Sequence, residues 1–443
     1  MVTELAKTDN SYQTAFRSVR DLSPTVPWLQ LVRGSAMDRF ELLGFPTVHE
    51  EDWKYTNLAA LAKQSFVPAT RRDEVSLDAS RFVYPETTAA HLVVINGFLS
   101  EELSDKTALE NVVAVDLLTA VSDARYNKIA RAYLARNAGY HNNGLAALNT
   151  AFLQSGLFVL IPKNVKVETP IQVTFLTDAE QADTASFPRL LVVAEEHSSA
   201  TLIESFVSTG DQQYFTNAVA EIIVKEGARL EHYRVQRESD KAFHTSLTSA
   251  ELGRSSSYDT TSINVGGRLS RHDVSVVMDN EGAECRVDGL YLVGSDQHTD
   301  THSVIDHQQP HCNSHQLYKG ILDGNARAVF NGKIFVREGA QKTDAMQTNK
   351  NLLLSPQARV DTKPQLEIYA DDVKCAHGAA VGQIDQEELF YLQTRGINPE
   401  LARGLLTYGF AEEVIEKIKI ESIKHQLDEI VLRQLDTQLE SSE

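Results

Sequence analysis

The sequence has few cysteines and no long apolar run, and each shortage excludes a class of protein. Three cysteines among 443 residues, Cys285, Cys312 and Cys375, are too few and too dispersed for a disulfide framework. No stretch approaches the roughly 20 apolar residues that span a bilayer, and residues 1–16 have no signal-like apolar run. We therefore expect a cytoplasmic protein whose cysteines are thiols, either buried or bound to metal.

Positive charge is scarce, and so are the motifs that bind nucleotides. Lys and Arg number 42 against 61 Asp and Glu, which gives a net charge of −19 and argues against nucleic acid as a partner. The chain lacks the G-x-x-x-x-G-K-[ST] loop for phosphates, and it lacks G-x-G-x-x-G, G-x-S-x-G and H-E-x-x-H. A pair of acid–base carboxylates, as on β-helical polysaccharide enzymes, stays open because sequence cannot place two carboxylates across a cleft.

Three regions differ in their periodicity. Residues 1–155 are mainly helical in pattern; for example, apolar residues repeat near the 3.6 period before Gly44 stops the run. Residues 156–382 consist of short β-branched runs between turn residues. The helical period returns in residues 383–443, where Asp385 is a plausible helix cap. We predict an N-terminal helical domain, a β core and a C-terminal helical domain with these boundaries.

A weak repeat in the central region indicates how the strands are stacked. Small residues after a turn recur at Ala200, Ala228, Ser256 and Ala283, which are 28, 28 and 27 positions apart. A fixed period of this size with strand content is typical of a β-solenoid or β-helix. The region has no helices long enough for βαβ crossovers. A large antiparallel sandwich with coincidental spacing is the alternative.

The most specific site candidate is the pair Cys375 and His377. Residues i and i+2 share one face of a strand, so the two side chains would project side by side. A thiolate and an imidazole suit borderline metals such as iron or zinc. A tetrahedral site needs four ligands, so either a second subunit supplies the rest or Cys375 is a packed thiol beside a hydrogen-bonded histidine.

A second group of residues is rich in histidine. It contains His298, His302, His307, His311 and His315, with Asp306 and Cys312 among them. This group could form a metal patch. Its spacing follows neither helix nor strand register throughout, which favours ordinary turn and strand-face residues.

Longer matches give a family resemblance. The segment Tyr-Ala-Asp-Asp-Val-Lys-Cys-Ala-His-Gly-Ala at 369–379 resembles the SufB/SufD family, and within it the SufD branch. The likeness extends to Glu-Asp-Trp-Lys-Tyr-Thr at 51–56 and to the segments 327–334, 342–344, 349–354, 360–368, 388–397 and 408–411. After His377 comes Gly-Ala-Ala-Val-Gly, where SufB-like chains tend to carry an acidic residue.

The resemblance implies a right-handed parallel β-helix between two helical domains. It implies a complex with a SufB-like paralogue, joined through the β-helix edges, and with a SufC-like ABC ATPase held by the C-terminal helices. The chain would then be a non-catalytic subunit for iron–sulfur cluster assembly, and its partner would hydrolyse ATP. A stand-alone homodimeric scaffold, or an interaction subunit without a metal ligand of its own, remains as an alternative.

The resemblance also implies roles for the two candidate residues. His377 matches the family position expected to bind iron or admit it at the paralogue interface, and Cys375 is a supporting thiol. The implied cargo is iron or a transient iron–sulfur cluster shared with the partner subunit. A reduced flavin in the complex stays an open alternative.

Overall fold

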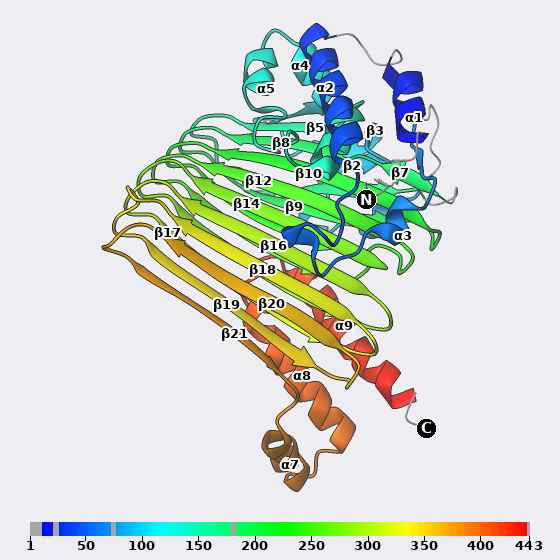
Figure 1. Cartoon of the computed structure of the whole chain (residues 1–443), viewed down its shortest axis with the longest axis vertical. Helices are drawn as coiled ribbons and strands as arrows, with labels where there is room; N and C mark the ends of the chain where they lie inside the picture. Colours follow the sequence, from blue (N-terminus) through cyan, green and yellow to red (C-terminus); the bar gives the residue numbers. More distant parts are fainter. Residues whose placement is uncertain (1–10, 21–25, 72–76, 179–182, 441–443) are drawn as a thin grey trace, which may run out of the picture.

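The computed structural model describes residues 11–20, 26–71, 77–178 and 183–440. Two large β-sheets, of 11 and 10 strands, run through the centre, with helices at both ends of the chain (Figure 1). The helices within these ranges are all too short or too polar to cross a bilayer.

From residue 189 onward, successive strands alternate between the two sheets. Sheet A contains β1 (Val67–Pro68), β4 (Val113–Asp116), β5 (Leu157–Ile161), β7 (Thr184–Ser186), β8 (Arg189–Ala194), β10 (Tyr214–Val224), β12 (Phe243–Leu252), β14 (Leu269–Met278), β16 (His298–His307), β18 (Arg327–Val336) and β20 (Arg359–Ile368). Sheet B contains β2 (His91–Ile95), β3 (Phe98–Asp105), β6 (Ile171–Thr177), β9 (Ser199–Ser208), β11 (Arg229–Gln236), β13 (Ser257–Asn264), β15 (Glu284–Val293), β17 (Asn313–Leu322), β19 (Asp344–Leu353) and β21 (Lys374–Gly382).

Parallel pairing between successive turns confirms the predicted solenoid and rules out the antiparallel sandwich. Each strand from β8 onward pairs in parallel with the strand two places along the chain, which gives about seven turns. Arg229 lies opposite Ser257, and Ser257 opposite Glu284, so the spacings of 28 and 27 are real turn lengths. The first spacing was wrong: Ser199 lies opposite Arg229, so Ala200 is two residues out of register with Ala228.

One corner of the solenoid explains why the repeat is visible. At this corner a residue with positive φ recurs in successive turns: His197, Gly227, Ser255, Gly282, His311 and Lys342. The N–H of each of the first two donates to a carbonyl of the next turn, His197 to Glu226 at 3.0 Å and Gly227 to Arg254 at 2.9 Å. Glycine is favoured at 227 because its φ is +64° and a Cβ there would lie 2.3 Å from His197 Nδ1.

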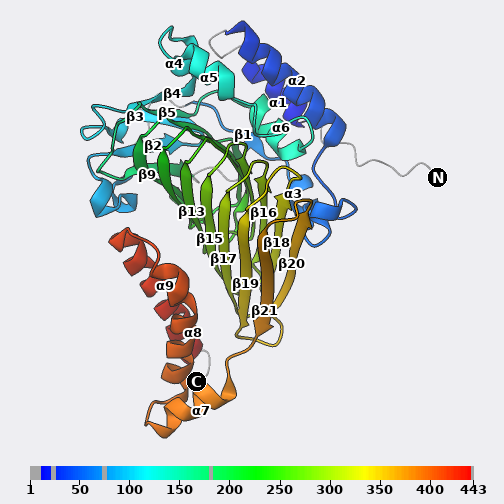
Figure 2. The ribbon, with the colours of Figure 1, turned by 90° about the vertical axis from the view of Figure 1, so that its left-hand side faces the viewer.

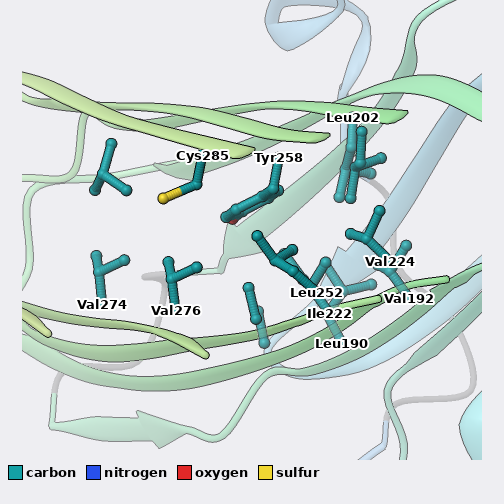
Figure 3. Packing of buried hydrophobic residues seen from close by; sticks show 14 of the residues in the cluster. Leu190, Val192, Leu202, Ile222, Val224, Leu252, Tyr258, Val274, Val276 and Cys285 are labelled. Atoms are coloured by element: carbon teal, nitrogen blue, oxygen red, sulfur yellow. The ribbon is translucent and has the colours of Figure 1, made fainter. Parts of the chain in front are cut away.

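The core lies between the two sheets. Alternate residues of each strand point inward, and the apolar ones form a continuous cluster along the solenoid (Figure 3). It includes Leu190, Val192, Leu202, Ile222, Val224, Leu252, Tyr258, Val274, Val276 and Cys285. Full burial of each aliphatic side chain is worth roughly 1.5–3 kcal/mol relative to exposure.

The N-terminal segments cover the first turns of the solenoid (Figure 1). Their helices are α1 (Ser11–Arg20), α2 (Pro27–Leu43), η1 (Glu51–Trp53), α3 (Ala59–Ala62), η2 (Ser80–Phe82), η3 (Pro85–Thr87), α4 (Leu117–Ser122), α5 (Asn127–Tyr133) and α6 (Gly144–Ala151). This part is less helical than expected, because β2, β3 and β4 join the sheets. The run His-Leu-Val-Val-Ile of β2 is fully buried and pairs in parallel with β6.

Residues 51–56, which we call the strap, cross the outer face of sheet A. The Trp53 ring lies over the Arg271 guanidinium, with 3.6 Å from Cζ to the ring centroid. Arg271 is 3% exposed and donates to Asp300 at 2.9 Å and to the carbonyl of Asp52 at 2.6 Å. Thr56 Oγ1 donates to the same Asp300 carboxylate at 2.5 Å. The buried Asp300 carboxylate therefore anchors the strap through Arg271 and Thr56, and an ion pair between Glu51 and Lys363 at 2.5 Å adds to this anchor.

Acid should release the strap, because Asp300 must be ionised to hold it. Burial alone would raise the pKa of Asp300, but Arg271 and His302 outweigh burial and hold that pKa well below its usual range. The stabilisation is thus present above about pH 4, the ordinary pKa, and is lost as pH falls toward the folded value. We expect Trp53 emission, measured in a Trp28→Phe background, to change only in strong acid. The Asp300→Asn variant should show a weakened strap already at neutral pH, and an unchanged acid transition in it would contradict this assignment.

Two C-terminal helices, α8 (Pro399–Ile415) and α9 (Glu421–Glu440), lie along the outer face of sheet B (Figure 2). The first C-terminal helix, α7 (Gln386–Thr394), packs against α8 beyond the end of the sheet. The predicted cap at Asp385 is confirmed, because its side chain accepts the N–H of Glu387 at 2.7 Å. Asn398 caps α8 in the same way and accepts the N–H of Leu401 at 2.7 Å. Lys417 also ties the helices to the sheet through the buried Asp288, at 2.9 Å.

Candidate metal-binding edge

The last turn of the solenoid is open. The strands β20 and β21 stand at the ends of the two sheets, and within the described ranges β20 pairs only with β18 and β21 only with β19 (Figures 1 and 2). Most residues of β21 are exposed, although the matching inward positions of β19 are buried. An unpaired strand edge presents free N–H and C=O groups that can accept another strand.

Cys375 and His377 lie on the inward side of this last strand. Their register partners on β19 are Ala345 and Gln347, which are both buried between the sheets. Cys375 is half-buried and packs against the apolar core, while His377 is exposed. Burial, aided by the charge of Asp344, raises the pKa of the Cys375 thiol. The two side chains therefore share one face, at a point where the interior opens to solvent.

Within the described residues, Cys375 and His377 supply two donors on the inward face of this edge. No group of three or more His, Cys, Asp or Glu side chains that could hold a metal ion occurs in the described part of the chain. The nearby Asp372 carboxylate is engaged by Lys342. A thiolate and an imidazole fit iron chemically, but they are half of a tetrahedral set.

The structure separates the histidine-rich group. His298 and His302 lie on the outer face of β16, where His302 bonds to Asp300 at 3.1 Å. His307 is buried in the interior and bonds to Ser314 at 2.8 Å. His311 occupies a corner with φ of 61°, and His315 is exposed on sheet B. Turn and strand-face roles therefore account for these residues.

A polar network inside the solenoid was not predicted from the sequence. Glu204 Oε1 lies 2.8 Å from His232 Nε2, and Arg234 donates to Asn264 at 3.0 Å and to Ser246 at 2.8 Å. Burial lowers the pKa of Arg234 to about 10. The alternation of residues along each strand could have indicated this network. Alternation alone, however, does not show which of the two faces of a strand points into the solenoid.

This architecture defines a β-solenoid protein whose unpaired last turn presents a thiol and an imidazole. Residues 175–410 match the family model for the SufBD core domain of SUF system FeS cluster assembly, and residues 6–173 match the SufBD protein N-terminal region. The chain belongs to the SufBD family of iron–sulfur cluster assembly proteins.

Individual relatives agree along nearly the whole chain. The chain is 37% identical over 410 residues to an iron–sulfur cluster assembly SufBD family protein of Synechocystis sp., covering 90% of this chain and 89% of the relative. It is 34% identical to the iron–sulfur cluster assembly protein SufD of Escherichia coli, covering 87% and 88%. It is 30% identical to the SufD protein of Bacillus subtilis, covering 92% and 94%.

Proposed function

We propose that this chain is a SufD-like, non-catalytic subunit that completes an iron–sulfur assembly site together with a SufB-like paralogue. The observation that carries the proposal is the open last turn, where Cys375 and His377 form half of a ligand set. A paralogue with the same fold can add its own strands at β20 and β21, because parallel edges accept further strands. The missing ligands would then come from the partner.

Within this site His377 is the iron ligand or iron-entry residue, and Cys375 is the supporting thiol. The imidazole is exposed and can meet incoming iron without any rearrangement of the core. The raised pKa keeps Cys375 protonated at neutral pH, so the thiol must lose its proton when metal binds. Iron is the substrate of this step, and the chain contributes position and two donors.

Replacing His377 by alanine should lower iron and sulfide loading without changing complex assembly. Loss of a ligand should weaken iron binding by at least about tenfold, the lower limit seen even when groups behind a ligand are removed. The measurement is metal and sulfide analysis, with Mössbauer spectra, of the complex co-expressed without oxygen. His315→Ala, an exposed histidine of sheet B, is the matched control. Full loading of the His377→Ala complex would remove His377 from the site.

An ABC ATPase would dock on the C-terminal helices. The chain has no phosphate-binding loop of its own, while α7 and α8 expose Phe390 (67%), Tyr391, Leu401 and Leu405. The opposite side of α8 is buried against sheet B. An exposed apolar patch of this kind marks an interaction surface.

Surface substitutions test this docking more sharply than deletion after Gly382. Deletion would uncover the apolar outer face of sheet B, which includes Ile203, Val235 and Leu290, and would destabilise the whole chain. A Phe390→Asp, Leu405→Asp variant should keep the fold and weaken ATPase binding by tenfold or more, about the effect of a hot-spot residue. Leu31→Asp, on exposed α2, is the control in the same pull-down. Undiminished co-purification of the double variant would rule out this surface.

A movement caused by nucleotide binding to the ATPase would be transmitted to the open edge through the contacts between α8 and sheet B. Lys319 of β17 donates to the carbonyl of Phe410 at 2.8 Å and pairs with Glu413 at 2.5 Å. Movement of α8 would therefore pull on sheet B, and two arrangements of the joined solenoids would be selected by nucleotide. A homodimer using the same edges is the competing assembly, and native mass measurement with and without the partners separates the two.

A further inference from the structure

The interior next to the candidate site contains an amide oxygen that bonds to nothing in the described chain. Gln347 of β19 is 1% exposed, and its Oε1 is buried without a hydrogen-bond partner. Leaving a buried acceptor unpaired costs stability, so a native structure with such an atom needs a reason for it.

The orientation of the Gln347 amide follows from the groups around it. Its Nε2 donates to Gln316 Oε1 at 2.6 Å, and Gln316 Nε2 donates to Ser303 Oγ at 2.8 Å, so this chain of bonds crosses from sheet B to sheet A. Gly332 of β18 makes room for the amide, because a Cβ there would lie 2.2 Å from Gln347 Nε2. The amide nitrogen of Gln347 is therefore hydrogen-bonded, and its amide oxygen has no partner within the described residues.

Gln347 is also the direct neighbour of His377. The two residues are register partners on β19 and β21, and both occupy the inward side of their strands. Paired residues on adjacent strands are separated by roughly 4.8 Å along the hydrogen-bond direction, which lets side chains on one face touch. The other side of His377 is the open edge, where no further strand of the described chain lies.

We propose that Gln347 is a positioning residue for His377. Its free Oε1 accepts the N–H of the neutral imidazole and thereby fixes one tautomer, which turns the lone pair of the other ring nitrogen toward the open edge. Histidine ligands are commonly oriented in this way by an acceptor behind them. This inference rests on the proposed function only for its purpose, because both residues belong to this chain and are register partners without any partner subunit.

The test reads the tautomer directly. The full chain is labelled with nitrogen-15 in its histidine rings, and His377→Ala identifies the signals of residue 377. At about pH 8, where an ordinary histidine is neutral, the wild-type ring should show one protonated and one unprotonated nitrogen. Gln347→Met removes the acceptor. The ratio of the favoured His377 tautomer to the other one should then fall by about fivefold, the effect of losing one ordinary hydrogen bond.

Two further variants guard against a general disturbance of the core. Gly332→Ala keeps the glutamine but pushes its amide away, and should lower the ratio in the same direction. Met346→Ala, on the exposed side of the same strand, should leave it unchanged. An unaltered His377 tautomer in Gln347→Met overturns the proposal. A second outcome separates the two proposals. If the His377 tautomer changes in Gln347→Met but the His377→Ala complex still loads full iron, the contact with Gln347 stands and the proposed function is contradicted.

Discussion

Replacing Glu221 by glutamine should lower the free energy of unfolding by about 3–5 kcal/mol, the cost of breaking a buried ion pair from one side. Glu221 of β10 and Arg189 of β8 are both 0% exposed, and their side chains meet at 2.5 Å. Glu221 also accepts four backbone N–H groups of residues 135–138, at 2.9–3.3 Å. Glutamine would leave the Arg189 charge buried without a counter-charge.

The same change one turn further along the solenoid provides a matched control. Glu251 of β12 accepts one hydrogen bond, from Asn137 Nδ2 at 2.8 Å, and is partly exposed. Glu251→Gln should therefore shift the midpoint of urea unfolding far less than Glu221→Gln. Adding Arg189→Met to Glu221→Gln should recover much of the loss, since no lone charge then remains buried and the glutamine carbonyl oxygen still accepts backbone N–H groups. Equal shifts for the two glutamine variants would show that the pair is not decisive.

Features set by a few neighbouring residues were predictable from the sequence. The caps at Asp385 and Asn398 depend only on a side chain and the two or three N–H groups that follow it. The solenoid was predictable because its corner imposes one backbone conformation in each turn, so that small residues recur at the turn length at Gly227, Ser255 and Gly282. The spacing between Ala200 and Ala228 was predicted wrongly, because that turn of the solenoid has 30 residues instead of 28.

Features that depend on residues far away along the chain were not predictable from the sequence. Alternation identifies two faces of β11 but does not say that His232 and Arg234 point inward. Buried polar groups are tolerated only where partners lie close, and Arg234 finds Ser246 on the facing sheet A. The residues of β2 alone do not determine its place in sheet B, since its partner strand β6 lies about 80 residues later.

The candidate site also has a part that the sequence predicts and a part that only the fold determines. That Cys375 and His377 share a face follows from their spacing of two. That Gln347 adjoins His377 follows only from the turn length of 30 residues between β19 and β21. The remaining ligands lie beyond the last strand, so their identity belongs to whatever chain pairs there.

Ala379→Pro should weaken that pairing strongly while leaving the chain folded. The N–H of Lys374 donates to Thr343 of the preceding turn at 2.8 Å, so in a parallel ladder the N–H groups of residues 375, 377, 379 and 381 point to the free edge. Proline at 379 removes one of these edge donors and none of the bonds to β19. Proline is tolerated on an edge strand for this reason.

The expected loss combines two effects at the proposed junction. A partner carbonyl left unpaired costs about 1–3 kcal/mol, and the proline ring holds the incoming strand away from the bonds on either side. We therefore expect the affinity for the SufB-like partner to fall by roughly a hundredfold, or nearly 3 kcal/mol, in a titration of the purified chains. Ala379→Val keeps the N–H and should bind almost as wild type. If the proline variant binds as tightly as the valine variant, then the chain does not meet its partner through the edge of β21, and the ligands that complete Cys375 and His377 must approach from the open face of the last turn instead.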